Sequence, residues 1–204
     1  MTTASHHASD DGPLAMLRRE HGVICDLADA MTRAIESSDG GSKPATRQLW
    51  QAAAGVLHAL AEQHHGKEET VLMSYLELRG FSRATRPLAA VLADHRRHDE
   101  LLDAVVAALA RASGDPRASA PLRVAFARYR AHLQRYIERE ENILLPLAER
   151  VLAAADAEEV MRRFGMFIEL SGGAGWYAGL MASADRIRGA ATRAVDQAGV
   201  GGGA

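Results

Sequence analysis

Histidine and glutamate residues recur at helical spacing in the middle of this sequence. His64 and Glu68 are four residues apart, so a helix would present their imidazole and carboxylate groups side by side. The adjacent residues, His65 and Glu69, would do the same on a neighbouring face. Imidazoles and carboxylates that converge in a dry interior bind metal ions, whereas those on a solvated face only carry charge. The chemistry of this segment therefore depends on which pair faces inward.

The apolar residues of the same segment indicate the inward pair. With a rotation of about 100° per residue, His64 and Glu68 fall within about 20° of the centre of an apolar stripe. His65 and Glu69 fall about 80° and 120° away from it. The stripe consists of Leu57, Leu60, Ala61, Val71, Leu72 and Tyr75. His64 and Glu68 are thus predicted to face the core, with His65 and Glu69 at its rim or in solvent.

Three further helical segments also carry polar, metal-competent residues on their apolar faces. These residues are His21 on the first segment, His95 and Asp99 on the third, with His98 nearer the edge, and Glu140 on the fourth. An unpaired buried charge costs on the order of several kcal/mol, so such groups can satisfy one another only by converging. Two carboxylates and several imidazoles in a dry cavity suit a pair of iron or manganese ions bridged by the carboxylates. A metal-free polar network is the alternative.

The elements that position these residues are predicted to be long helices. Apolar residues recur with a helical period, and no run alternates apolar and polar residues as a strand would. Breaks rich in Gly, Pro and Ser separate the helices, and Pro146 is expected to bend or end the fourth. The predicted fold is all-α: an antiparallel up-down-up-down four-helix bundle with additional C-terminal helices. Its helices are expected over about residues 13–37, 46–79, 87–112 and 122–155, with shorter ones over 156–170 and 176–197.

Composition divides the chain into four parts. Residues 1–12 and the Gly-rich residues 199–204 are predicted to be disordered ends. Residues 13–155 form the bundle, and residues 156–198 supply C-terminal helices that are expected to pack on its outside. The Gly-rich break at residues 172–175 is interpreted as a turn, because it lacks the strand and lysine of a phosphate-binding loop.

Charge and composition exclude several function classes. The formal net charge of -2 gives no argument for a nucleic-acid partner or an anionic membrane surface. No apolar run approaches the ~18 residues of a membrane span, and the N-terminus lacks the apolar core of a secretory signal. Cys25 is the only cysteine, so no disulfide forms within the chain, which is compatible with a reducing cytoplasm. A cytoplasmic monomer or weak homo-oligomer is expected.

Two motifs and their order along the chain resemble a known family. His64-xxx-Glu68-Glu69-xx-Leu72 is followed by Glu140-Glu141-xx-Leu144-Leu145-Pro146, with single histidines on the first and third helices. Over roughly residues 13–155 this pattern is similar to the hemerythrin-like, or HHE cation-binding, domain family. The resemblance implies an antiparallel four-helix bundle around a non-haem centre of two iron ions, bridged by an oxo or hydroxo group.

The resemblance also implies a role for each candidate ligand. Glu68 and Glu140 would bridge the two ions, and the histidines would divide between them. His21 and His64 would bind one iron. The other would be bound by His95, with Asp99 where family members often have a second ligand and His98 as the fallback.

One departure from the family pattern concerns the fourth helix. The family has a histidine four residues before the glutamate at position 140, and Tyr136 stands there. His132 is the fallback ligand, but it lies about 12 Å along the helix axis from Glu140. Phenolate suits ferric iron, so ligation by Tyr136 would favour redox or peroxide chemistry over reversible oxygen carriage. The alternative is that Tyr136 only hydrogen-bonds a bridging carboxylate or a solvent ligand.

The predicted function is that of a di-iron protein that binds or reacts with dioxygen, peroxide or nitric oxide. Nothing in the sequence decides between a carrier and a peroxide-decomposing, catalase-like enzyme. Two other classes remain open: an iron- or oxygen-dependent sensor or interaction module, and a structural bundle with a degenerate metal site.

Overall fold

The computed structural model describes residues 12–37, 44–111 and 119–200. Most of the residues predicted to be disordered, 1–12 and 199–204, lie outside these ranges. So do most residues of the loops expected between the first and second helices and between the third and fourth.

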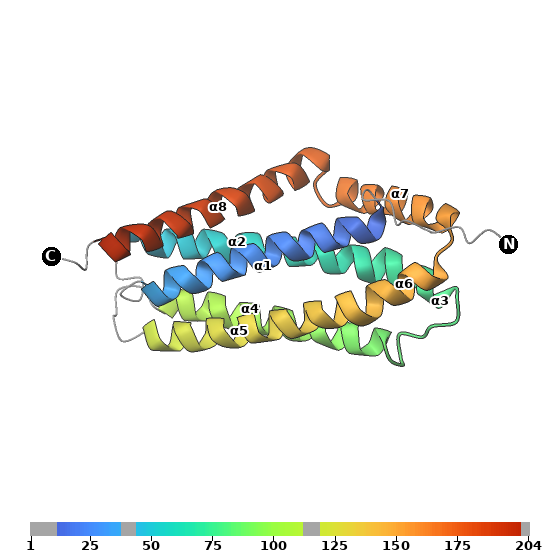
Figure 1. Cartoon of the computed structure of the whole chain (residues 1–204), viewed down its shortest axis with the longest axis horizontal. Coiled ribbons are helices and arrows are strands. Elements are labelled where there is room, and N and C mark those ends of the chain that lie inside the picture. Colours follow the sequence, from blue (N-terminus) through green and yellow to red (C-terminus); the bar gives the residue numbers. More distant parts are fainter. Residues whose placement is uncertain (1–11, 38–43, 112–118, 201–204) are drawn as a thin grey trace.

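Four long helices form the body of the molecule (Figure 1). They are α1 (Pro13–Ser37), α2 (Pro44–Lys67), α4 (Leu88–Arg111) and α5 (Ser119–Arg139). In Figure 1 the chain reverses direction from each of these helices to the next. α1 packs against α2 and α5, and α4 packs against the same two helices, which closes the bundle. The described residues contain no strand, so the predicted all-α fold is confirmed.

The second and fourth predicted helices each contain a wider, π-helical turn at a matching place. These turns span Glu68–Leu72 and Glu140–Leu144. Helix α3 (Met73–Glu77) follows the first turn, and α6 (Leu145–Val151) follows the second. Each π turn begins at a predicted bridging glutamate, and its carbonyl accepts a hydrogen bond from the amide five residues on.

Pro146 does not end the fourth helix, contrary to one of the two outcomes expected for it. It occupies the first turn of α6, directly after the second π turn, and α6 continues to Val151. A proline is tolerated there because its missing N–H falls in a turn where the regular hydrogen-bond ladder is already interrupted.

Polar residues separate two apolar clusters along the bundle. One cluster includes Ile24, Leu60, Leu102 and Ile137. The other includes Leu17, Val71, Val91 and Leu144. Each helix therefore passes from one apolar cluster to the other through a short polar segment, and these segments carry the predicted ligands. Burial on both sides restricts the access of water to this layer.

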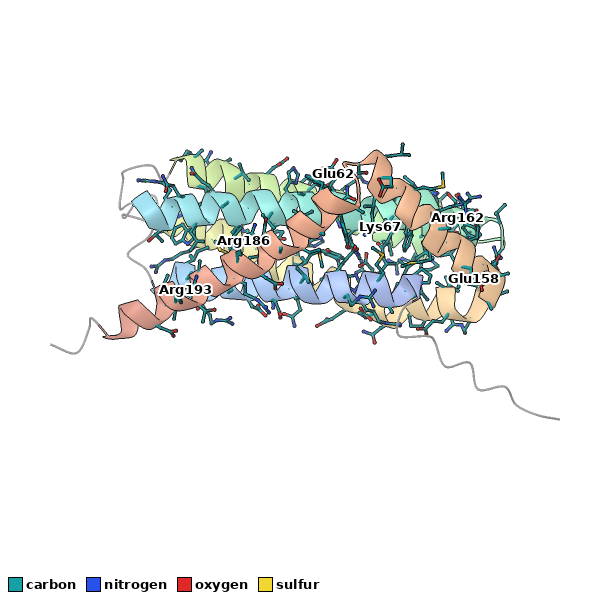
Figure 2. All side chains as sticks on the ribbon, turned by 90° about the horizontal axis from the view of Figure 1, so that it is seen from above. Glu62, Lys67, Glu158, Arg162, Arg186 and Arg193 are labelled. Atoms are coloured by element: carbon teal, nitrogen blue, oxygen red, sulfur yellow. The ribbon has the colours of Figure 1, made fainter. Side chains whose placement is uncertain are left out.

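Two C-terminal helices cover one side of the bundle. They are α7 (Ala154–Leu170) and α8 (Ala174–Val200), and α8 lies along α1 and α2 (Figures 1 and 2). The turn between them contains Gly172 and Gly173 at φ of 138° and 88°, a region that L side chains rarely adopt. None of the described helices has the apolar length that crossing a membrane requires.

Candidate metal centre

Five predicted ligands meet in the polar layer: His21, His64, Glu68, His95 and Glu140. All five are buried, with exposures of 3% or less. The Nε2 atoms of His21 and His64 are 2.9 Å apart. One ligand atom from each of His21, His64, Glu68 and Glu140 lies within 4.8 Å of the others. We call these five residues the inner cluster. It is the kind of nitrogen and oxygen donor set that first-row transition metals accept.

Each carboxylate of the inner cluster faces imidazoles on two sides. Glu140 Oε2 lies 3.0 Å from His21 Nε2, and its Oε1 lies 2.9 Å from His95 Nε2. Glu68 Oε1 lies 3.6 Å from His64 Nε2, and its Oε2 lies 3.2 Å from His95 Nε2. Both carboxylates therefore lie between the His21 and His64 pair on one side and His95 on the other.

A carboxylate accepts a hydrogen bond from the second nitrogen of every cluster histidine. His21 Nδ1 donates to Glu141 at 2.6 Å, and His95 Nδ1 donates to Glu69 at 2.7 Å. His64 Nδ1 donates to Glu20 at 2.9 Å. We call Glu20, Glu69 and Glu141 the outer carboxylates. They fix the ring orientations and leave each Nε2 directed at the inner cluster, as outer partners of metal-bound histidines do.

Sequence reasoning missed the role of the outer carboxylates, although a signal for it was present. Glu69 and Glu141 each directly follow a cluster glutamate, and Glu20 directly precedes a cluster histidine. Adjacent helical residues point about 100° apart, so such a neighbour cannot join the same cluster. It can instead reach round a histidine on the next helix, which makes it an outer partner.

The buried charges of the site shift its pKa values strongly. Burial alone would lower the pKa of His64, but the carboxylates around it, Glu68 first among them, raise that pKa to about 10. Burial and the charge of Glu140 raise the pKa of Glu68. Burial would also raise the pKa of Glu20, but the hydrogen bond from His64 and the charge of Lys67 lower it to about 2. A metal ion entering the inner cluster would therefore have to displace protons from its imidazoles.

A comparison with protein families agrees with this donor set. The family model of the hemerythrin HHE cation-binding domain matches residues 12–148. The chain belongs to this family. The match takes in every residue of the inner cluster and ends before α7 and α8. Comparisons with curated proteins and with solved structures found no match.

The third long helix of the HHE domain faces the core differently from the prediction. Asp99 was expected to point inward, but its side chain is 53% exposed, whereas His98 is fully buried. On the same helix, Val106 is 45% exposed, whereas Leu101 is buried. The buried face of α4 is therefore turned toward His98, and Asp99 lies outside the inner cluster.

The prediction that His65 lies at the rim or in solvent is also wrong. The His65 ring is buried and stacks on His95, with 3.9 Å between ring centroids. α2 is covered by α1, α4 and α8, so more of its circumference is buried than a single stripe implies. Glu69 does lie at the rim, with its side chain 37% exposed, yet it contacts the cluster through His95.

The two candidates for a ligand from α5 occupy different environments. His132 donates a hydrogen bond from Nε2 to the carbonyl of Asp94 at 3.0 Å, and it lies outside the inner cluster. Tyr136 is buried beside the cluster, and its ring meets those of His95 and His98 edge-on. Its hydroxyl has no hydrogen-bond partner among the described residues. Burial and the charge of Glu140 raise the pKa of this phenol well above its usual range.

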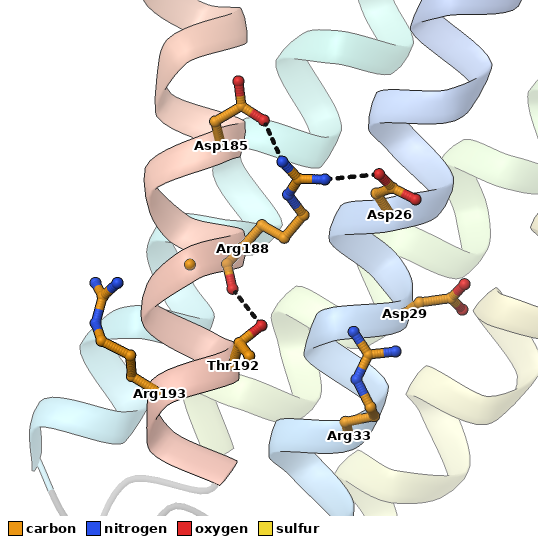
Figure 3. Close-up of a pocket in the computed structure, with 8 residues that line it drawn as sticks. Asp26, Asp29, Arg33, Asp185, Arg188, Thr192 and Arg193 are labelled. Atoms are coloured by element: carbon orange, nitrogen blue, oxygen red, sulfur yellow. Dashed lines mark hydrogen bonds and ion pairs between the residues drawn. The ribbon is translucent and has the colours of Figure 1, made fainter. Parts of the chain in front are cut away.

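A surface cleft lies away from the inner cluster. It has a volume of about 530 Å³ and lies between α1 and α8 (Figure 3). Its central residue, Arg188, pairs with Asp26 at 2.7 Å and with Asp185 at 3.0 Å. Asp26 and Asp185 are already paired with Arg188, so this cleft does not supply an alternative to the inner cluster as a metal site.

Proposed function

We propose that this HHE domain holds two iron ions in the inner cluster and reacts there with dioxygen, peroxide or nitric oxide. The observation that carries the proposal is the position of two buried carboxylates, Glu68 and Glu140, between imidazoles on both sides. One ion would be held by His21 and His64, and the other by His95. Both carboxylates would serve both ions.

The donor set fits a cation better than it fits a metal-free network. Both oxygens of Glu68 and Oε2 of Glu140 are buried and make no well-aligned hydrogen bond to a described residue, although imidazole Nε2 atoms lie 3.6, 3.2 and 3.0 Å from them. A buried carboxylate oxygen without a partner is costly, and a metal ion would satisfy it. Imidazole and carboxylate together suit iron or manganese. Iron at such a site supplies one-electron chemistry toward small oxygen and nitrogen species.

The surrounding residues would orient the site and keep it dry. The outer carboxylates hold the three imidazoles by Nδ1, and the two apolar clusters lie on either side of the polar layer. A small uncharged molecule can cross apolar side chains more readily than a hydrated ion can, which favours the small gaseous or peroxide ligands named above. A cytoplasmic location and a monomeric or weakly associated state remain predictions.

Tyr136 is proposed as the ligand from α5. Its buried hydroxyl lacks a partner among the described residues, and phenolate suits ferric iron. A visible tyrosinate-to-iron band in the iron-loaded protein, lost in Tyr136→Phe with iron retained, would support ligation. If Tyr136→Phe keeps the band, the hydroxyl serves only as a hydrogen-bond donor near the site. Loss of iron in His132→Ala would instead indicate that α5 distorts to bring His132 in.

Elemental analysis after expression with added iron tests the di-iron proposal. We expect two iron ions per chain, and Glu68→Ala and Glu140→Ala should each remove most of the iron, because each carboxylate serves both ions. His58→Ala is the matched control, since His58 is an exposed histidine on α2. A wild-type protein that folds but binds no iron would support a degenerate site instead. An iron-loaded protein whose absorption spectrum does not change on addition of dioxygen, peroxide or nitric oxide would contradict the proposed reactivity.

An iron- or oxygen-dependent sensor is the second candidate function, and one observation favours it. Tyr177 of α8 hydrogen-bonds Glu20, the outer carboxylate of His64, so a helix outside the family match reaches the site. A partner that co-purifies with only the metal-loaded or only the metal-free protein would support this function.

A further inference from the structure

One outer carboxylate differs from the other two in its surroundings. Glu69 and Glu141 have side chains that are 37% and 32% exposed, so water can solvate them. Glu20 is only 2% exposed. Its carboxylate therefore depends on protein groups alone to satisfy the oxygen that does not face His64.

Two side chains contact this second oxygen of Glu20. Tyr177 of α8 donates its hydroxyl hydrogen to Glu20 Oε1, and the ammonium group of Lys67 pairs with the same oxygen. The other oxygen, Oε2, accepts the hydrogen bond from His64 Nδ1. The Lys67 ammonium also lies over the Tyr177 ring, 4.9 Å from its centroid. The four residues form a continuous chain of contacts from α8 to the inner cluster.

The burial of Lys67 shows that this chain depends on the C-terminal helices. Lys67 is fully buried, which is rare for lysine unless the charge is paired. In Figure 2 it lies where α7 and α8 cross the bundle. Gly66 directly precedes Lys67, and Phe167 of α7 packs on it. The contact is so close that a Cβ at Gly66 would clash with the Phe167 ring. Without these helices the Lys67 and Glu20 pair would face water.

We propose that Tyr177 and Lys67 are positioning residues of the metal centre. They hold Glu20 in the orientation that fixes the His64 ring, so the docking of α8 on α1 and α2 sets the metal affinity on the His64 side. The part of this inference that concerns affinity rests on the proposed metal-binding function. The part that concerns the His64 ring does not.

The Tyr177→Phe variant tests the proposal, because it removes one hydroxyl and keeps the ring over Lys67. In the metal-free protein, we expect the nuclear magnetic resonance signal of the His64 Nδ1 proton to shift and to exchange faster with water. Competition between a chelator and the protein for Co²⁺ should show affinity weakened about threefold to tenfold, the value of one hydrogen bond. Arg188→Gln is the matched control: it breaks a contact of α8 with Asp26 on α1 and leaves Glu20 untouched.

A double-mutant cycle makes the test specific. Glu20→Gln alone should weaken Co²⁺ binding about tenfold to a hundredfold, and adding Tyr177→Phe to it should weaken binding no further. Additive losses would overturn the proposal, because Tyr177 would then act by another route. Equal losses in Arg188→Gln and Tyr177→Phe would overturn it too, since general docking would explain both. If the wild-type protein binds no metal, the proposed function fails, but an unchanged His64 signal in Tyr177→Phe still overturns this inference on its own.

Discussion

A histidine whose Nδ1–H is held by a carboxylate presents Nε2 as its only available lone pair. All three histidines of the inner cluster are held in this way, by carboxylates from other helices. The outer carboxylates thereby select both the tautomer and the direction of each ring. If the inner cluster binds metal as proposed, its affinity would therefore also depend on residues that do not touch the metal.

The first prediction concerns Glu69. Glu69→Gln replaces the carboxylate that holds His95 with a neutral amide, and we expect it to weaken metal binding about tenfold to a hundredfold. Chelator competition with Co²⁺ measures this change. Glu62→Gln, an exposed position on α2, should bind as the wild type does. Wild-type affinity in Glu69→Gln would mean that the contact with His95 has no influence on the site.

The second prediction concerns pH. His64 has a pKa raised to about 10 in the folded, metal-free protein, against about 6.5 when unfolded. A raised pKa contributes stability that is complete below about pH 6.5 and is lost as the pH rises through about 10. Thermal unfolding in a chelator should therefore show a melting temperature that falls over this range, and Co²⁺ affinity should rise over the same range.

The variants that check this pH dependence lie on the same helix. His64→Gln should flatten both profiles, although His21 and His95, whose pKa values are also raised, keep part of the effect. Gln51→Ala, at an exposed position of the same helix that carries no titratable group, should leave the profiles unchanged. A metal-free protein that becomes more stable between about pH 6.5 and 10 would contradict a raised pKa at His64.

At the residue scale, the sequence correctly predicted which side chains face the core where a helix buries a single face. His21, His64, Glu68 and Glu140 lie on stripes that a constant rotation per residue locates correctly. Asp99 was misplaced because apolar residues flank both it and His98, and only the packing of α4 shows which flank is buried. His65 was misplaced because a helix with neighbours on three sides buries more than one stripe.

At the element scale, the two π turns are the feature that connects the helices to the site. A π turn widens the helix, and here both turns begin at the glutamates that face each other in the inner cluster. The helix ranges were predictable from apolar periodicity and breaks. The π turns were not, because one extra residue per turn hardly changes the apolar pattern over five residues.

The third prediction concerns the contact between α2 and α7. Gly66→Ala places a Cβ where the Phe167 ring lies, so we expect the free energy of unfolding to fall by about 1–3 kcal/mol. Gly55→Ala on the same helix meets no atom within 4 Å and should instead stabilise the protein by about 0.5–1 kcal/mol. Urea unfolding followed by circular dichroism measures both. A stabilised Gly66→Ala would show that α7 does not pack on α2 in solution.

At the scale of the whole molecule, the polar layer leaves the metal-free protein with buried charges between two apolar clusters. A ligand that binds only the folded state stabilises it by mass action, by about 2.7 kcal/mol at a hundred times its dissociation constant. The fourth prediction is that metal loading raises the melting temperature by about 5–10 °C for a chain of this size. Differential scanning calorimetry with metal and with chelator measures the difference. Equal melting temperatures would contradict a metal site in the core.

The cover formed by α7 and α8 was only partly predictable. Their helical periodicity indicated helices packed outside the bundle, but nothing in the pattern specified which face they cover. Lys67 has the sequence surroundings of a solvated residue, and its burial becomes intelligible only once Tyr177 and Glu20 are seen beside it.

The place of α8 in the chain also sets an order in time. Ribosomes add about 5–20 residues per second, so the helices that carry the inner cluster are complete several seconds before α8 ends at Val200. Before α8 docks, Glu20 would lack its contact with Tyr177, and an ion could approach His64 from the side that α8 later covers. After α8 docks, an ion could use that path only if α8 moved away from α1 and α2. On the proposed function, metal met during synthesis and metal offered to the finished protein would thus reach the cluster by different routes and at different speeds.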